Sequence, residues 1–266
     1  MIKRYGKLMF VNRKDEIMEK KELLYTGKAK KMYATNQEKV LLAEYLNQVT
    51  SLNGAKKENV EGKGELNNQI TGLIFTYLAE KGVASHYIQE VSKTEQLIRE
   101  VEMIPLEVVV RNTSAGSFTK RFGIEEGIDL PFPILEFYYK NDKLDDPFIN
   151  DSHVKMLNVA NDEEIIEIKK QALEINAVLV EMFKKIAIRL IDFKIEFGKT
   201  ADGKIILADE ISPDTCRLWD INTKEHLDKD LYRRDLGDII PVYTEVLERL
   251  NNLQINESSF RVNTDK

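Results

Sequence analysis

The stretch from Leu190 to Gly198 carries the side chains best suited to chemistry in this chain. It alternates apolar with polar residues, and its charged positions are Asp192, Lys194 and Glu196. Because side chains alternate faces along a β-strand, we expect these three to share one face. The opposite, apolar face then holds Ile191, Phe193, Ile195 and Phe197. A face made only of charges of both signs is unusual for a solvated strand, so this strand is our first candidate for a functional site.

The Asp202-Gly203 dipeptide that follows is a strong hairpin-turn signal. If these two residues form the loop, residues 204–210 return as a strand and Glu196 lies opposite Asp209. Two carboxylates at about 4 Å repel by roughly 1 kcal/mol in water and about 4 kcal/mol in a protein-like dielectric. A divalent cation bound between them would remove that repulsion. A solvated hairpin compensated by lysines has the same pattern, and a one-residue bulge would break the register.

A second cluster is predicted where a buried strand ends. The apolar run at 106–110 favours a strand, and it leads into Arg111 and then into small residues that include Gly116 and Ser117. An arginine fork beside hydroxyl and backbone donors suits anion capture. A capped strand end with a surface arginine is the alternative. Asp214, Arg217 and further polar residues follow the hairpin within a few positions.

The third candidate is the turn Gly27-Lys28-Ala29-Lys30, between predicted strands at 22–25 and 29–33. The spacing of a P-loop is absent. A glycine turn followed by lysines can still cover phosphates, as glycine-rich loops do in kinases. A solvated turn with lysines is the alternative.

Three predicted helices and several strands position these clusters. Apolar residues at helical spacing predict helices over 65–81 and 161–189, and a terminal helix over 232–250 that is bent or interrupted near Gly237 and Pro241. Further strands are expected at 40–45 and 137–140, and residues 50–64 are expected to form a loop.

The composition limits the class of protein. The 266 residues, 42% hydrophobic and 32% charged, suffice for a large globular core. A net charge of −6 argues against a general nucleic-acid binder. Cys216 is the only cysteine, the three histidines lack metal-ligand spacing, and no apolar run is long enough for a membrane helix. We therefore expect no membrane partner and a cytoplasmic location.

Together, the lysine turn, the acids and the arginines suit a metal-bound nucleotide and an anionic metabolite. The residue types alone predict an ATP-dependent enzyme that acts on an anionic metabolite, and they do not identify the reaction. A small-molecule kinase and a non-catalytic nucleotide-binding protein remain alternatives.

The order of motifs resembles the SAICAR synthetase (phosphoribosylaminoimidazole-succinocarboxamide synthetase) family. Residues 105–112 with 115–117 look like its first signature and 190–198 like its second. The resemblance runs from about Lys20 to Leu250. It implies an α+β fold with two lobes: a small antiparallel N-terminal lobe over a larger one, ATP in the cleft, and a relation to ATP-grasp and kinase-like folds. We expect an extension over 1–19, the ATP-covering lobe over 20–104 and the second lobe over 105–266.

The resemblance also implies the reaction. A ligase of this family joins L-aspartate to the carboxylate of carboxyaminoimidazole ribonucleotide (CAIR), through an acyl phosphate, and cleaves ATP to ADP and phosphate. ATP and Mg²⁺ are the implied cofactors, and a homodimer is the implied assembly.

Site roles follow from the resemblance, residue by residue. Catalytic roles fall on Lys194, Asp192 and Asp214; ATP contacts on Lys28, Lys30, Met32, Met103 and Lys140; ribonucleotide contacts on Arg111, Ser117 and Arg217; and metal ligation on Glu196 and Asp209. One loop departs from the family pattern, because Gln48 and Asn53 stand where many members have aspartate. We expect the region 50–56 to contact substrate.

Overall fold

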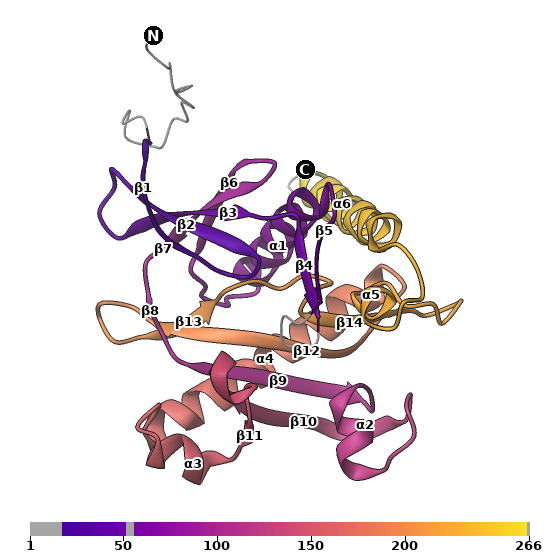
Figure 1. Cartoon of the computed structure of the whole chain (residues 1–266). Coiled ribbons are helices and arrows are strands. Elements are labelled where there is room, and N and C mark those ends of the chain that lie inside the picture. The colour runs from indigo at the N-terminus through magenta and orange to yellow at the C-terminus, as the bar shows by residue number, and fades with distance from the viewer. Residues whose placement is uncertain (1–17, 52–55, 265–266) are drawn as a thin grey trace.

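The computed structural model describes residues 18–51 and 56–264. Its first sheet is antiparallel and contains five strands in the order β1-β2-β3-β7-β6 (Figure 1). The strands are β1 (Lys20–Thr26), β2 (Lys30–Thr35), β3 (Val40–Tyr45), β6 (Tyr87–Ser92) and β7 (Glu95–Arg99). The short turn between β1 and β2 is the predicted glycine turn, and Gly27 N–H donates to the carbonyl of Lys30 across it.

The second sheet is larger and is built around β12 (Ile188–Lys199), which pairs with four strands. Its first half lies between β14 and β9, and its second half pairs with β13 and β8. The remaining strands are β8 (Glu102–Met103), β9 (Leu106–Thr113), β10 (Asp129–Tyr139), β11 (Phe148–Ile149), β13 (Ile205–Ala208) and β14 (Cys216–Asp220). A two-stranded unit, β4 (Gln48–Ser51) with β5 (Lys56–Asn59), completes the strands.

Helix α4 (Asp162–Lys185) supports the second sheet from behind (Figure 1). Asn161 and Glu164 form a reciprocal capping box at its start, which satisfies backbone donors that the first turn leaves unpaired. Its apolar face then packs against β9 and β12, and Ile168, Ile175 and Leu179 are fully buried there. Burial of such a side chain contributes about 1.5–3 kcal/mol, so this helix fixes the back of β12.

The other helices are α1 (Lys63–Glu80), α2 (Ser117–Phe122), α3 (Asp151–Met156), α5 (Asp230–Arg233) and α6 (Ile239–Thr264), with a 3₁₀ turn η2 at Asp142–Leu144. Helix α1 packs against both α6 and the strand β6 of the first sheet. It therefore connects the first sheet with the C-terminal helix. Within the described residues, no helix is long and apolar enough to cross a membrane.

The expected α+β class, with antiparallel sheets, is confirmed. The helices predicted over 65–81 and 161–189 are present, and the predicted interruption near Gly237 separates α5 from α6. The expected loop over 50–64 is wrong in part, because β4 extends to Ser51 and β5 covers 56–59. The predicted boundary between residues 104 and 105 falls in the link between β8 and β9.

The predicted hairpin register is wrong by one residue. Glu196 pairs with Ala208, not with Asp209. The loop is a turn from Thr200 to Gly203, in which Gly203 N–H donates to the Thr200 carbonyl and Gly203 has φ +81°. That left-handed glycine is the extra residue of a bulged three-residue loop, the alternative to a two-residue turn.

Candidate active site

All thirteen side chains with predicted site roles line one pocket of about 780 Å³. Its walls come from both sheets and from the loops after β13 and β14. The residues are Lys28, Lys30, Met32, Met103, Arg111, Ser117, Lys140, Asp192, Lys194, Glu196, Asp209, Asp214 and Arg217. Gln48 and Thr50 also line it, whereas Asn53 lies outside the described residues.

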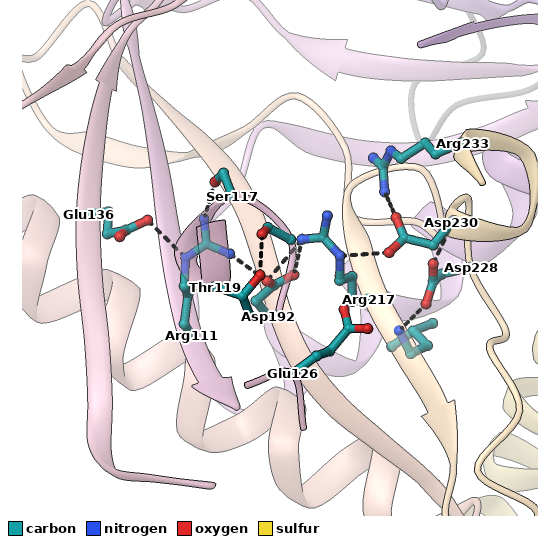
Figure 2. Close-up of polar contacts among 12 residues, drawn as sticks. Arg111, Ser117, Thr119, Glu126, Glu136, Asp192, Arg217, Asp228, Asp230 and Arg233 are labelled. Atoms are coloured by element: carbon teal, nitrogen blue, oxygen red, sulfur yellow. Dashed lines mark hydrogen bonds and ion pairs between the residues drawn. The ribbon is translucent and has the colours of Figure 1, made fainter. Parts of the chain in front are cut away.

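One end of the pocket is an Arg–Asp–Arg row across three adjacent strands, which we call the anion cluster (Arg111, Ser117, Asp192 and Arg217). Asp192 of β12 is the direct cross-strand partner of Arg111 on β9 and of Arg217 on β14. Its carboxylate accepts from Arg111 Nη1 at 2.6 Å and from Arg217 Nη1 at 2.9 Å (Figure 2). Ser117 Oγ accepts from Arg111 Nη2 at 3.2 Å. The row thus presents two guanidinium groups in a fixed orientation.

Two further acids hold the outer sides of this row. Arg111 Nε donates to Glu136 at 2.8 Å and Arg217 Nε donates to Asp230 at 2.9 Å (Figure 2). Burial opposes the charge of Arg217, but Asp192 and Asp230 outweigh it and raise its pKa. Among the described residues, Arg217 Nη2 donates to no protein acceptor, so this edge of the fork remains for a ligand.

Gly116 allows the close approach of Arg217 to the start of α2. A Cβ built on Gly116 would lie 2.4 Å from Arg217 Nη2, and Gly116 has φ +57°. Both the space and the left-handed backbone therefore require glycine at this position. Neighbouring Ser117 is the first residue of α2, which places its hydroxyl beside the two arginines.

A Gly116→Ala exchange tests this close approach. We expect the KM for the anionic substrate to rise about tenfold, because a displaced guanidinium loses a charged hydrogen bond. The matched control is Gly123→Ala, since Gly123 has φ +64° but nothing within 4 Å of the added Cβ. Steady-state kinetics should show the KM effect only in Gly116→Ala. Both variants should lose stability from backbone strain, and Gly116→Ala more, because Gly116 has ψ −129° and lies outside the αL region that Gly123 occupies. Equal KM values in the two variants would contradict the argument.

The middle of the pocket holds a lysine–carboxylate cluster, made of Lys30, Lys140, Lys194, Glu196 and Asp209. Lys194 Nζ lies 2.6 Å from Glu196 Oε1 and 3.6 Å from Asp209 Oδ2. Lys30 donates to Asp209 at 2.5 Å, and Lys140 donates to the second oxygen of Glu196. The two acids therefore do meet, through Lys194, although they are not cross-strand partners.

Charge complementarity sets the ionisation of this cluster. Burial opposes the charge of Lys194, but Glu196 and Asp209 outweigh it, so the pKa of Lys194 lies well above its ordinary value. Burial likewise opposes the charge of Asp209, yet Lys30 and Lys194 hold the pKa of this carboxyl far below its ordinary value. Lys194 and Asp209 are thus ionised at neutral pH, which suits binding of phosphate and cation together.

Asp214 is a further buried carboxylate that lines the pocket. Lys63 Nζ of α1 lies 2.5 Å from its Oδ2, and Tyr243 Oη of α6 donates to its Oδ1 at 2.7 Å. Burial opposes its charge, but Lys229 and Lys63 lower the pKa of Asp214 below its ordinary range. These partners hold the carboxylate in one position. If Asp214 has the predicted catalytic role, it acts without moving from that position.

The opposite end of the pocket is less charged. Met32 of β2 is buried, Met103 of β8 is 39% exposed, and Ile98 and Val101 lie nearby on the pocket wall. Lys28 of the glycine turn forms an exposed ion pair of 2.7 Å with Asp142 of η2. An apolar wall beside a lysine turn is suited to a nucleotide base next to its phosphates.

Several residues that line the pocket were given no site role from the sequence. Glu107 lies 3.4 Å from Lys194, and Glu210 lies 3.6 Å from Lys30. Lys229 is nine-tenths buried, and burial lowers its pKa. The alternation of β9 places Glu107 on the face opposite Val108, which is a usable signal. Lys229 and Glu210 lie in irregular segments, where no periodicity marks them.

The residues present fit a divalent cation at the lysine–carboxylate cluster. Glu196 and Asp209 supply oxygen ligands of the kind that Mg²⁺ prefers. A second group, His226, Asp228 and Asp230, also brings possible ligand atoms within 4.8 Å of one another. Asp230 there is paired with Arg217, Arg233 and Arg234, just as Glu196 and Asp209 are paired with lysines, so charge does not separate the two groups. Glu196 and Asp209 line the pocket, whereas His226, Asp228 and Asp230 are not among its lining residues, which makes the first group the better candidate for a cation.

Comparison with known proteins is consistent across sequence and structure. The family model of SAICAR synthetase matches residues 23–250. A phosphoribosylaminoimidazole-succinocarboxamide synthase of Enterococcus faecalis is 63% identical over 233 residues, which cover 88% of this chain and 98% of the relative. A phosphoribosylaminoimidazole-succinocarboxamide synthase from Ehrlichia chaffeensis has a similar crystal structure, with a TM-score of 0.84, 43% identity and coverage of 86% and 98% of the two chains. The structure of a SAICAR synthetase (Type-2) in complex with ADP is also similar, with a TM-score of 0.84 and 46% sequence identity. The match covers 87% of this chain and 98% of that chain.

Proposed function

The chain belongs to the SAICAR synthetase family and is an ATP-dependent ligase of purine biosynthesis, and we propose that L-aspartate is joined to CAIR in its mixed-charge pocket. The observation that carries this proposal is the presence, in one pocket, of an anion cluster beside a lysine–carboxylate cluster. A ligase that activates a carboxylate with ATP needs both a ribonucleotide phosphate site and a phosphoryl-transfer site.

We assign the anion cluster to the 5′-phosphate of the ribonucleotide. Arg111 and Arg217 supply the charge, Arg217 Nη2 supplies a donor, and the Ser117 hydroxyl lies beside them. Asp192 accepts from both guanidinium groups, so its carboxylate orients the row, and in this assignment it would also contact the polar body of the substrate. The bidentate geometry of arginine suits phosphate better than a lysine would.

The lysine–carboxylate cluster is assigned to phosphoryl transfer. Lys28 and Lys30 would contact ATP phosphates from the β1–β2 side, with Met32 and Met103 beside the base and Lys140 beside the phosphates. Glu196 and Asp209 would hold Mg²⁺, which supplies charge neutralisation for the transferred phosphoryl group when bound. Lys194 would stabilise the negative charge on the oxygens of that group.

The chemistry proceeds in two balanced steps. An oxygen of the CAIR carboxylate attacks the γ-phosphorus of ATP, the bond to the bridging oxygen breaks, and ADP leaves. The free amine of aspartate then attacks the acyl carbon, the bond from that carbon to the bridging oxygen breaks, phosphate leaves with this oxygen, and the nitrogen releases its proton to solvent. In this assignment, Lys194 would stabilise the charge that develops on the leaving group of each step. Asp214 is the proposed orienting acid. The region 50–56, predicted to contact substrate, is the proposed contact for the amino acid: Thr50 lines the pocket, as does Gln48 before it, and residues 52–55 lie outside the described residues.

We expect ADP release to require both CAIR and L-aspartate. Without the amine, the acyl phosphate has no nucleophile except water, so turnover should fall to a small fraction of the full rate. A coupled ADP assay with each substrate omitted in turn measures this dependence. A small-molecule kinase would release ADP at the full rate without aspartate, and that outcome would reject the ligase assignment.

We also propose that the protein forms a homodimer and is located in the cytoplasm. Family likeness supports the homodimer, and analytical ultracentrifugation of the purified chain tests it directly.

A further inference from the structure

Asp209 has a backbone conformation that decides where its carboxylate points. It follows the last residue of β13 and has φ +61°. An aspartate in this left-handed region costs about 1–2 kcal/mol relative to an extended residue. Other contacts must therefore hold Asp209 in this conformation.

The hairpin register shows why this conformation matters. Ala208 is the cross-strand partner of Glu196, so the two side chains share one face of the sheet. If the strand simply continued, Asp209 would point to the opposite face, away from Glu196. The left-handed residue breaks this alternation and returns the carboxylate to within 3.6 Å of Lys194.

His86 makes a direct contact with this irregular residue. Its Nε2 lies 3.1 Å from the backbone carbonyl of Asp209. A carbonyl oxygen only accepts, so Nε2 carries the hydrogen and donates it. The ring is 3% exposed and packs edge-on against Phe75 at a centroid distance of 5.8 Å.

The segment that carries His86 is itself fixed to β13. Leu207 N–H donates to the Ala84 carbonyl at 3.2 Å, and His86 N–H donates to the Leu207 carbonyl at 2.9 Å. The carbonyl of His86 in turn accepts from Arg99 N–H at the end of β7. The backbone that carries the imidazole is thus hydrogen-bonded to strands of both sheets, beside the end of β13.

We propose that His86 is a positioning residue for the cation site: its hydrogen bond to the Asp209 carbonyl holds Asp209 in the left-handed conformation that aims its carboxylate at Glu196. This inference rests on the proposed metal assignment to Glu196 and Asp209. Partners that orient ligands typically change metal affinity about 10- to 100-fold when they are removed.

The test measures binding of Mn²⁺, as a probe for Mg²⁺, in the presence of ADP by electron paramagnetic resonance. We expect His86→Leu, which lacks the donor, to raise the Kd for Mn²⁺ about 10- to 100-fold. His86→Gln retains an N–H donor at similar reach and should restore most of the affinity. In steady-state assays, His86→Leu should raise the Mg²⁺ concentration at half-maximal rate, while kcat at saturating Mg²⁺ largely recovers.

Thr71→Val is the matched control. Thr71 Oγ1 donates to the Ile211 carbonyl, two residues after Asp209, in a buried hydrogen bond of 3.2 Å. Its loss removes a contact to the same segment without touching Asp209, so the Mn²⁺ Kd should stay at the parent value. An unchanged Kd in His86→Leu, or equal losses in the leucine and glutamine variants, would overturn the inference.

The Asp209→Asn variant distinguishes failure of the metal assignment to Glu196 and Asp209 from failure of the positioning role of His86. If it binds Mn²⁺ as the parent does, the metal assignment itself fails. If it loses Mn²⁺ while His86→Leu retains it, the metal assignment stands and the positioning role of His86 fails.

Discussion

The Glu196→Gln variant is expected to turn over about 10³-fold more slowly than the parent, at the upper end of the loss found for a single electrostatic contact to a reacting group. Glu196 is 1% exposed and accepts from both Lys140 and Lys194. The amide has nearly the same shape but removes the charge that holds two ammonium groups and, in our assignment, the cation. Lys194 would then be drawn toward Asp209 and away from the transferred phosphoryl group.

Two measurements check this prediction. The coupled ADP assay gives the rate, and thermal unfolding with ATP gives the rise in Tm caused by Mg²⁺, which the variant should lose. Glu164→Gln is a matched control, because Glu164 is also paired with a lysine of β12, Lys199 at 2.6 Å, at the far end of that strand. Glutamine preserves its role in the capping box of α4. A normal Mg²⁺ response in Glu196→Gln would reject Glu196 as a ligand.

The second large effect concerns the Arg–Asp–Arg row. We expect Arg217→Met to raise the KM for the ribonucleotide about 10- to 100-fold, because one charged donor to the phosphate is lost. The same change should cost about 3 kcal/mol of unfolding free energy, since two buried carboxylates lose a partner. This free-energy cost is at the low end for removal of one partner from a buried ion pair, because Asp192 remains paired with Arg111 and Asp230 with Arg233.

Substrate kinetics and urea unfolding measure the two effects separately. Arg217→Lys keeps the charge but not the planar fork, so its KM should lie between those of the parent and the methionine variant. Arg249→Met is the control for stability alone. Arg249 pairs with Asp220 at 2.6 Å, but it does not line the pocket, so its loss should leave the KM unchanged. A parental KM in Arg217→Met would remove Arg217 from the phosphate site.

Local patterns in the sequence predict the strands that carry the site. β12 alternates visibly, and the apolar run of β9 ends at Arg111, so the residues that occupy one pocket could be selected before the structure was known. Family resemblance then assigned roles that alternation cannot provide. The roles themselves remain proposals, because lining a pocket does not establish what a side chain does there.

The hairpin register could not be predicted from the same patterns. An Asp-Gly pair suits a two-residue loop and also a three-residue loop with a left-handed glycine, and the two differ by one position in register. The return of Asp209 to the correct face depends on its own positive φ and on contacts from the segment 84–86. Such long-range contacts leave no local signal.

The buried residues that pair with the site could not be predicted from the sequence either. Lys63 lies on an otherwise ordinary helix, α1, yet it pairs with Asp214 from a position about 150 residues earlier in the chain. A lysine at the start of a helix is expected to be solvated. Only the packing of α1 against the segment after β13 shows that this one is fully buried.

The Arg–Asp–Arg row has a consequence for folding. Its members meet only when β12 has paired with β9, which precedes it by the whole of β10, α3 and α4, and with β14, which follows the hairpin. Pairing over such a separation requires closure of a long loop and is characteristic of slow, late steps in folding. A partly folded chain therefore lacks the complete phosphate site that we propose. In this assignment the ribonucleotide would bind only the finished sheet, so it would stabilise the native state by mass action and leave folding intermediates unaffected.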